Sequence, residues 1–354
     1  MAKIDSFLQY LVQNEGSDLH LSCGDVPIVR IHGHVHRVKY ATLTAQELEG
    51  LLFEILTPEQ KERYETTRDL DFAYEVPGLA RFRGNLFVQH RGPGAVFRVI
   101  PSKIPTADEL KLPQAIRDFT ELNKGLVLVT GPTGSGKSTT LAAMIDLINS
   151  SRAEHILTVE DPIEFVHPIR KALVNQREVG PHTNSFATAL KAALREDPDV
   201  ILVGEMRDRE TISLALTAAE TGHLVFGTLH TNSAHKTVDR IIDTFPADQQ
   251  EQVRAMLSES LRGVVAQQLL RKKGKGRVAA HEILVGTPAV GNLIREAKTF
   301  QLPSIVQTGK QHGMVQMDQS ILSLLSAGVV EPEEAYAKAH DKSLFRPHLE
   351  GMRA

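Results

Sequence analysis

The chain has 354 residues, enough for about two domains, and 42% of them are hydrophobic and 23% charged, as in soluble globular proteins. A formal net charge of −3, from 40 basic and 43 acidic residues, disfavours general binding to nucleic acid. Cys23 is the one cysteine, which excludes an intramolecular disulfide and a multi-cysteine zinc site, and no apolar run reaches the roughly 18–20 residues that span a bilayer. These features favour a soluble protein of a reducing cytoplasm.

The pattern of residues 1–100 predicts a separate α/β domain that begins with an amphipathic helix. Residues 29–36 alternate apolar and polar side chains, which predicts one half-buried strand with His32, His34 and His36 on a common face. Imidazoles in such a row would suit a metal ion. No carboxylate or cysteine completes the ligand set, so a solvated strand face is the favoured interpretation.

The remaining elements of this domain are a polar helix and three strands, predicted over residues 45–65, 71–76, 80–89 and 94–100. In the second of these strands Arg81 and Arg83 share one face, and Phe82 lies on the other. The third strand carries Arg98. The first two arginines therefore project from the same side of the predicted sheet.

Residues 101–113 contain three prolines and are predicted to be a linker. A larger core follows over 114–290, where strands and helices alternate, as expected for a sheet with helices on both faces. Within it, residues 271–277 are basic and rich in glycine, and an exposed hairpin turn is favoured there over a phosphate site. From 291 to 354 the pattern is helical.

The segment 131–138 reads Gly-Pro-Thr-Gly-Ser-Gly-Lys-Ser and fits the phosphate-loop pattern at every fixed position. It lies between a predicted buried strand, 125–130, and a predicted helix. Glycines let backbone N–H groups turn toward phosphates, and the helix N-terminus adds its positive end. We expect Lys137 to reach the β- and γ-phosphates of ATP and Ser138 to hold Mg²⁺. The residues predicted to bind ATP are Gly131, Thr133, Gly134, Ser135, Gly136, Lys137, Ser138 and Thr139.

Three carboxylates, Glu160, Asp161 and Glu164, follow a predicted buried strand that ends before Pro162. Carboxylates at the end of a core strand orient and deprotonate an attacking water, and Glu164 is the predicted base. Glu160 is the second candidate for that role. An exposed acidic turn without a catalytic role is the alternative.

Two further strands end in side chains suited to nucleotide chemistry. Residues 200–203 are predicted to deliver Glu205 to the carboxyl end of a buried strand, a Walker B arrangement that holds Mg²⁺ through a water. Residues 224–229 predict another buried strand with His223 at its start and His230 at its end. Because ligands bind at carboxyl ends, His230 is predicted to contact the γ-phosphate, and His223 is predicted to be structural.

In order and spacing, these four motifs resemble the secretion ATPase superfamily of type IV pilus and type II secretion motors. The resemblance implies an α/β chain with a PAS-like N-terminal domain, a RecA-like P-loop core and a helical C-terminal extension. It implies a homohexamer that hydrolyses ATP with Mg²⁺ and works on an inner-membrane pilus platform protein. Such a motor lies in the cytoplasm at the inner face of the inner membrane, is held there through its partner, and makes no direct contact with nucleic acid.

Residues 17–21 and 292–296 are similar to signatures of the pilus retraction branch, so the resemblance covers nearly the whole chain. It implies a motor that powers twitching motility by retracting and disassembling pili. The alternatives are an accessory retraction ATPase, an assembly or secretion ATPase of the same superfamily, and a RecA-like DNA translocase. One departure is Gly291, which stands where the family's C-terminal motif usually has an arginine.

The family's N-terminal domain packs beside a nucleotide site. An arginine supplied by a neighbouring subunit accelerates phosphoryl transfer by roughly 10³–10⁵. The resemblance therefore makes Arg81 and Arg83 the candidates for this role, and a solvated strand face is the alternative for both.

Overall fold

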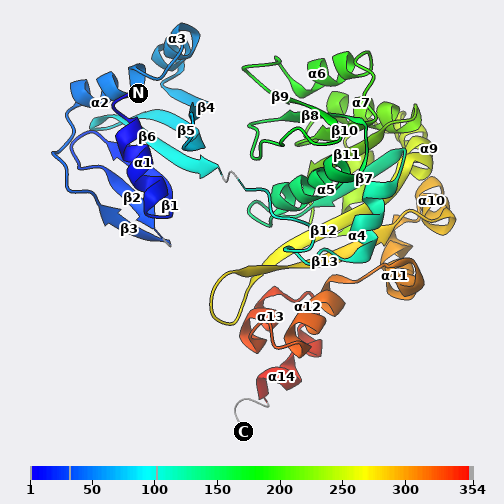
Figure 1. Ribbon diagram of the computed structural model, residues 1–354. Coiled ribbons are helices and arrows are strands. Elements are labelled where there is room, and N and C mark those ends of the chain that lie inside the picture. The colour runs from blue at the N-terminus through cyan, green and yellow to red at the C-terminus, as the bar shows by residue number, and fades with distance from the viewer. Residues whose placement is uncertain (1, 32, 101–102, 351–354) are drawn as a thin grey trace. The chain divides into compact units, whose positions relative to one another are not determined.

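The computed structural model describes residues 2–31, 33–100 and 103–350 (Figure 1). It divides the chain into two compact units, Met1–Lys103 and Ile104–Ala354. None of the helices that it describes is long and apolar enough to cross a membrane.

The first unit is an antiparallel sheet of six strands, in the order β3-β2-β1-β6-β5-β4, with three helices. Alternate strand residues and the helices' apolar faces form its core, which includes the fully buried Phe82 and Phe97. The strands are β1 (Gly16–Ser22), β2 (Ile28–Ile31), β3 (His34–Arg37), β4 (Asp69–Val76), β5 (Ala80–Gln89) and β6 (Gly92–Ile100), and the helices are α1 (Asp5–Gln13), α2 (Ala45–Phe53) and α3 (Pro58–Thr67).

Two predictions in this unit were wrong. The single strand expected over 29–36 is a hairpin of β2 and β3, because the chain turns at Gly33, whose φ of +86° favours glycine. The single helix expected over 45–65 is two helices, because Thr57 caps a new helix whose first residue is Pro58. His34 and His36 lie on the exposed strand β3, and His32 lies outside the described residues.

The second unit is built on a sheet of seven strands, in the order β13-β12-β7-β11-β10-β8-β9. All neighbours are parallel except β12 and β13, which form an antiparallel hairpin. The strands are β7 (Gly125–Thr130), β8 (His155–Glu160), β9 (Leu173–Glu178), β10 (Val200–Val203), β11 (Leu224–Leu229), β12 (Leu261–Arg271) and β13 (Arg277–Val285). The basic segment 271–277 forms the exposed end of this hairpin, as predicted.

Helices cover both faces of this sheet, which confirms the predicted α/β class (Figure 1). Successive residues of β7 alternate between two core clusters, one packed on α4 and α5 and the other on α6 to α11. The helices are α4 (Gln114–Asp118), α5 (Lys137–Ser151), α6 (Phe186–Ala193), α7 (Arg209–Glu220), α8 (Ala234–Asp243), α9 (Gln250–Ser260), α10 (Pro288–Arg295) and α11 (Leu302–Thr308).

The segments next to this core differ from the expected domain limits. Residues 104–113 belong to the second unit and not to a linker, because Ala107 and Leu112 are buried in its core and Arg117 donates to both of their carbonyl oxygens. At the other end α10 and α11 contribute to the main core. A separate small core lies under the last helices, which are α12 (Met317–Ser326), α13 (Pro332–Lys338) and α14 (Arg346–Glu350).

Candidate active site

The carboxyl ends of β7, β8, β10 and β11 meet at one edge of the sheet, because these four strands are parallel neighbours. The phosphate loop follows β7, and Glu160 is the last residue of β8. Glu205 and His230 follow β10 and β11 within two residues. The topology therefore gathers at one edge the four motifs predicted to bind and hydrolyse the nucleotide, and Figure 1 shows the strands that lead to them.

The phosphate loop connects the fully buried strand β7 to the 15-residue helix α5. Gly131, Gly134 and Gly136 have φ angles of +146°, +76° and +88°, a region that side chains with a Cβ atom rarely adopt. The glycines of the motif are thus required by the backbone itself. The loop leads into the N-terminus of α5, where the helix dipole favours a bound anion.

Lys137 opens α5 and is half-buried beside the loop. Its Nζ donates to the carbonyl oxygens of Gly131 at 2.9 Å and Pro132 at 3.3 Å. Burial lowers the pKa of Lys137, and the nearby charges of Glu205 and Glu164 act in the opposite direction. Both glutamates therefore lie close enough to this ammonium group to interact with it.

The position of Glu205 is fixed by the strands on both sides of β10. Gly204 N donates to the carbonyl oxygen of Val159 at the end of β8, and Met206 N donates to that of Thr228 on β11. The hydroxyl of Thr228 also donates to the carbonyl oxygen of Gly204 at 2.6 Å. Hydrogen bonds of the residues on either side thus hold the backbone at Glu205 in place.

The carboxylate of Glu205 has two basic partners. His230 Nε2 lies 2.8 Å from Glu205 Oε1, and Arg207 Nε lies 2.5 Å from the same oxygen. Burial alone would raise the pKa of Glu205, but hydrogen bonds and charges from Arg207 and His230 outweigh it, and the pKa is lowered. Glu205 is therefore ionised at neutral pH.

Glu160 differs from Glu205. Thr158 Oγ1 and Gln176 Nε2 donate to Glu160 Oε1 at 2.7 and 3.2 Å, but no basic side chain pairs with it among the described residues. Burial raises the pKa of Glu160 and exceeds the lowering by these hydrogen bonds. The protonated form of this side chain is thus favoured relative to a glutamate in water.

Glu164 lies in a loop whose backbone is hydrogen-bonded by two side chains of strand β9. Glu178 Oε2 accepts a hydrogen bond from Ile163 N at 3.0 Å, and Gln176 Nε2 donates to the carbonyl oxygen of Phe165 at 2.9 Å. Ile163 and Phe165 are buried, and Glu164 between them is exposed. This geometry leaves the Glu164 carboxylate accessible to solvent and near Lys137.

The two histidines on either side of β11 have different surroundings. His223 Nδ1 lies 2.9 Å from the carbonyl oxygen of Ala218, so this ring ties the strand to the end of α7. His230 is exposed at the carboxyl end and contacts Glu205. The structure thus places His230 at the candidate site and gives His223 a local hydrogen bond to the backbone.

Gln267 was missed by the sequence reasoning. It lies on β12 with 3% of its surface exposed, and its side chain contacts both the phosphate loop and α5. Its signal in the sequence is a pair of polar residues inside the apolar run 264–270. A polar side chain in a predicted buried strand requires a hydrogen-bond partner, which would have made it a candidate.

Arg207 was missed as well, although it stands two residues after Glu205. No local pattern identifies Gln176 and Glu178 as supports of the acidic loop, because their partners in these hydrogen bonds lie 11 to 16 positions away in the chain. These contacts arise from the pairing of β8 with β9.

Arg81 and Arg83 lie on β5 in the first unit, opposite the buried face that holds Phe82, as the alternation predicted. Arg83 Nε lies 3.9 Å from Asp71 Oδ1 and its side chain is 45% exposed. Arg98 on β6 donates to the buried carboxylate of Asp18 at 2.8 Å. Arg98 therefore has a structural partner within its own unit.

The residues suited to hold Mg²⁺ are Ser138, in the first turn of α5, and Glu205, whose charge acts on the adjacent Lys137. A hydroxyl and one carboxylate fit this ion, since Mg²⁺ usually keeps several waters and takes its other oxygens from nucleotide phosphates. Among the described residues no group of three or more His, Cys, Asp and Glu side chains could hold a metal ion by itself.

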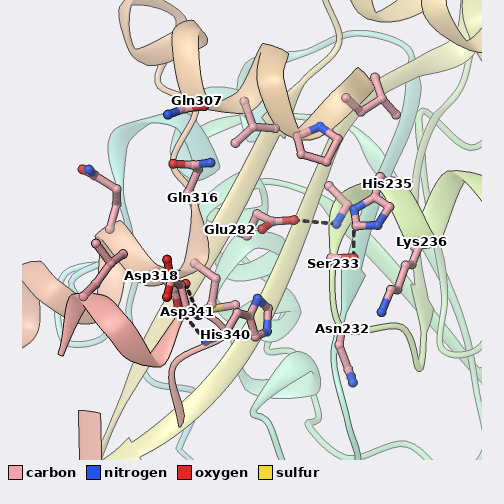
Figure 2. Close-up of a pocket in the computed structure, with 17 residues that line it drawn as sticks. Asn232, Ser233, His235, Lys236, Glu282, Gln307, Gln316, Asp318, His340 and Asp341 are labelled. Atoms are coloured by element: carbon pink, nitrogen blue, oxygen red, sulfur yellow. Dashed lines mark hydrogen bonds between the residues drawn. The ribbon is translucent and has the colours of Figure 1, made fainter. Parts of the chain in front are cut away.

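A cavity of about 760 Å³ lies elsewhere in the second unit, between the first turn of α8, β13 and the helices from α11 onward (Figure 2). Its carboxylates bind backbone N–H groups. Glu282 accepts from Ala234 N at 2.7 Å, and Asp318 accepts from His340 N and Asp341 N at 2.8 Å each. No residue predicted to bind ATP lines this cavity, which lies between α8 and the C-terminal helices.

Comparison with known proteins gives the family. The model of the Type II/IV secretion system protein family matches residues 3–337. A type IV pilus retraction ATPase, PilT of Pseudomonas aeruginosa, is 54% identical over 95% of this chain and 98% of its own length. A twitching motility protein of Neisseria gonorrhoeae is 56% identical over 89% of this chain and 84% of its own.

A solved structure of the pilus retraction motor PilT with bound ADP superposes with a TM-score of 0.91. It is 46% identical and covers 98% of this chain and 100% of the other. The chain therefore belongs to the Type II/IV secretion system protein family and is an ATPase of its pilus-retraction type.

Proposed function

We propose that this ATPase is the homohexameric, Mg²⁺-dependent motor that retracts type IV pili by disassembling them. The observation that carries the proposal is the single sheet edge where the phosphate loop, Glu164, Glu205 and His230 meet. The likeness to pilus retraction ATPases over almost the whole chain supports the same function.

Hydrolysis begins with binding of the nucleotide. Backbone N–H groups of the loop and the start of α5 hold the phosphates, and the ammonium group of Lys137 offsets their charge. Glu164 then takes the proton of the attacking water, since it is exposed, lies near Lys137, and is held by a braced loop. Glu160 suits this role less, because burial favours its protonated form.

Ser138 and Glu205 would hold Mg²⁺, which neutralises charge on the phosphate oxygens when bound. Arg207 and His230 keep Glu205 ionised and oriented. Because His230 touches Glu205 at the edge where phosphates bind, we assign it the task of reporting whether the γ-phosphate is present.

Arg81 and Arg83 are our candidates for arginines that act on the nucleotide of a neighbouring subunit. Hexamers of an Arg83→Ala variant should bind ATP and turn over slowly. Mixing them with Lys137→Ala subunits should restore part of the activity, because an intact site then meets an intact arginine. The measurement is ATPase rate against mixing ratio, with hexamer formation checked by light scattering.

The motor would act from the cytoplasm on an inner-membrane platform protein and reach the membrane through that partner. The C-terminal motif in α10 is the proposed transmission segment. Gly291 in it is buried, and a Cβ there would lie 2.8 Å from the carbonyl oxygen of Ser258 on α9. In this chain a larger side chain at position 291 would therefore meet the backbone of α9.

Deletion of the gene, complemented with wild type or with Lys137→Ala, tests the retraction role. Hyperpiliated cells that fail to retract support it, and only the wild type should restore twitching. Bald cells would identify an assembly motor. Normal retraction with reduced force would identify an accessory ATPase, and salt-sensitive stimulation of ATPase activity by DNA would identify a translocase.

A further inference from the structure

The side chain of Gln267 bridges two parts of the nucleotide site from strand β12. Its Nε2 donates to the carbonyl oxygen of Ser135 in the phosphate loop at 2.7 Å, and its Oε1 accepts from Thr140 Oγ1 in α5 at 2.8 Å. Both hydrogen bonds are buried. One amide thus satisfies a loop carbonyl and a helix hydroxyl that water cannot reach.

The loop also packs on Gln267 at two of its glycines. A Cβ at Gly131 would lie 2.3 Å from the carbonyl oxygen of Gln267, and one at Gly136 would lie 2.8 Å from its Nε2. Neither position has room for a side chain. The loop therefore lies directly on β12, and Gln267 is the residue beneath it.

The hydrogen bond to Ser135 fixes the direction of a peptide group. In a trans peptide the carbonyl oxygen and the following N–H point in opposite directions. Because the Ser135 oxygen points toward Gln267, the N–H of Gly136 points away from β12. In phosphate loops of this pattern, such N–H groups hold the phosphates.

A neutral side chain lies next to this amide. His281 on β13 is directly opposite Gln267 in the antiparallel register, so the two side chains share a face of the sheet. His281 is 5% exposed, and burial lowers its pKa to about 4. At neutral pH it brings no charge that would draw the Gln267 amide away from the loop.

We propose that Gln267 is a positioning residue for the nucleotide: it holds the Ser135–Gly136 peptide group in the orientation that binds phosphate. The inference rests on the ATPase activity and on the phosphate loop as its nucleotide site. Its effect is on affinity for ATP and ADP alike, since the same N–H serves both.

Gln267→Met tests this, because it keeps the length of the side chain and removes both hydrogen bonds. Gln268→Met is the matched control: Gln268 is the next residue on the strand, and its side chain lies on the other face and donates to the carbonyl oxygen of Lys338. We expect Gln267→Met to raise the dissociation constants for MgATP and ADP about tenfold or more. KM should rise by more than kcat falls, and the rise in Tm on adding ADP should shrink. Gln268→Met should bind like wild type.

Wild-type nucleotide affinity in Gln267→Met would overturn the inference, as would a lower Tm without any loss of affinity. Failure of the wild-type protein itself to bind ATP would instead refute the nucleotide site. Should Gln267→Met not fold, Thr140→Val removes one of the two bonds and should weaken binding about threefold or more. Thr140→Ser keeps the hydroxyl and should bind the nucleotides with wild-type affinity. Equal affinities in these two variants would also overturn the inference.

Discussion

Strands β8 and β10 are parallel neighbours, and each leads into a glutamate at the same edge of the sheet. The pKa values of the two carboxyl groups are nevertheless shifted in opposite directions. Glu160 accepts hydrogen bonds from neutral donors, and burial raises its pKa. Glu205 is paired with Arg207 and His230, and its pKa is lowered. The sequence pattern, an apolar run followed by an acid, is the same in both.

The difference shows that the strand supplies position and the neighbours supply chemistry. On the β8 side, the proposed base is not the glutamate at the strand end but Glu164, four residues later, where β9 supports the loop. On the β10 side, the group two residues past the strand is itself the charged one. The same local pattern is thus followed by two different arrangements. The proposed base lies in a loop after its strand, and the proposed Mg²⁺ ligand lies directly after its strand.

The largest effect is expected for Glu164→Gln. This change removes the proposed base and leaves the phosphate loop untouched, so kcat should fall by about 10²–10⁴ while ATP still binds. Single-turnover hydrolysis together with nucleotide titration measures both. Turnover near the wild-type rate would transfer the base role to Glu160 or remove it from this segment.

A smaller loss is expected for Glu205→Gln. The amide cannot replace the carboxylate toward Mg²⁺ or Arg207, so the Mg²⁺ concentration for half-maximal activity should rise about 10- to 100-fold. A magnesium titration of ATPase rate is the measurement, with Glu210→Gln on the exposed surface as the control. An unchanged titration curve would show that Glu205 does not serve the ion.

Glu160→Gln should have little effect on catalysis. An amide resembles the neutral carboxyl group that burial favours, so the rate at neutral pH should stay within about threefold of wild type, roughly 0.7 kcal/mol. A loss as large as that of Glu164→Gln would place Glu160 in the reaction and remove the contrast between the two ends.

The same variant should alter the pH dependence of stability. The folded-state pKa of Glu160 is raised, so the unfolded chain releases this proton first, and stability falls as pH rises from about 4.5 through the folded value. Glu160→Gln lacks this group, so its stability relative to wild type should increase over that window, by at most about 1.4 kcal/mol per pH unit. Thermal unfolding of both proteins between pH 4 and 8 measures the difference, and parallel curves would contradict the raised pKa.

The parts that the sequence predicted well are governed by short-range patterns. The strands β7, β10 and β11 have the predicted bounds because each is a buried apolar run of four to six residues. The phosphate loop was recognisable because its glycines are demanded by its own backbone. The errors at Gly33 and Thr57 arose where a single turn or cap overrides a longer periodicity.

The parts that could not be predicted depend on long-range pairing. Gln267 meets the phosphate loop through the pairing of β12 with β7, and Gln176 meets the acidic loop through that of β9 with β8. The role of Arg207 was missed because, in a sequence, an arginine near an acid is typical of an ordinary surface residue. Such partners become visible only when the strand order is known.

The contact between Ser135 and Gln267 spans 132 positions of the chain. A ribosome makes the phosphate loop and helix α5 early in synthesis. It adds Gln267, the residue beneath the loop, much later. Until β12 is synthesised and inserted beside β7, a nascent chain carries the nucleotide motif without its support. On the inference above, ATP therefore stabilises the growing core less until then, and this protein gains the full contribution of its ligand to folding late in its synthesis.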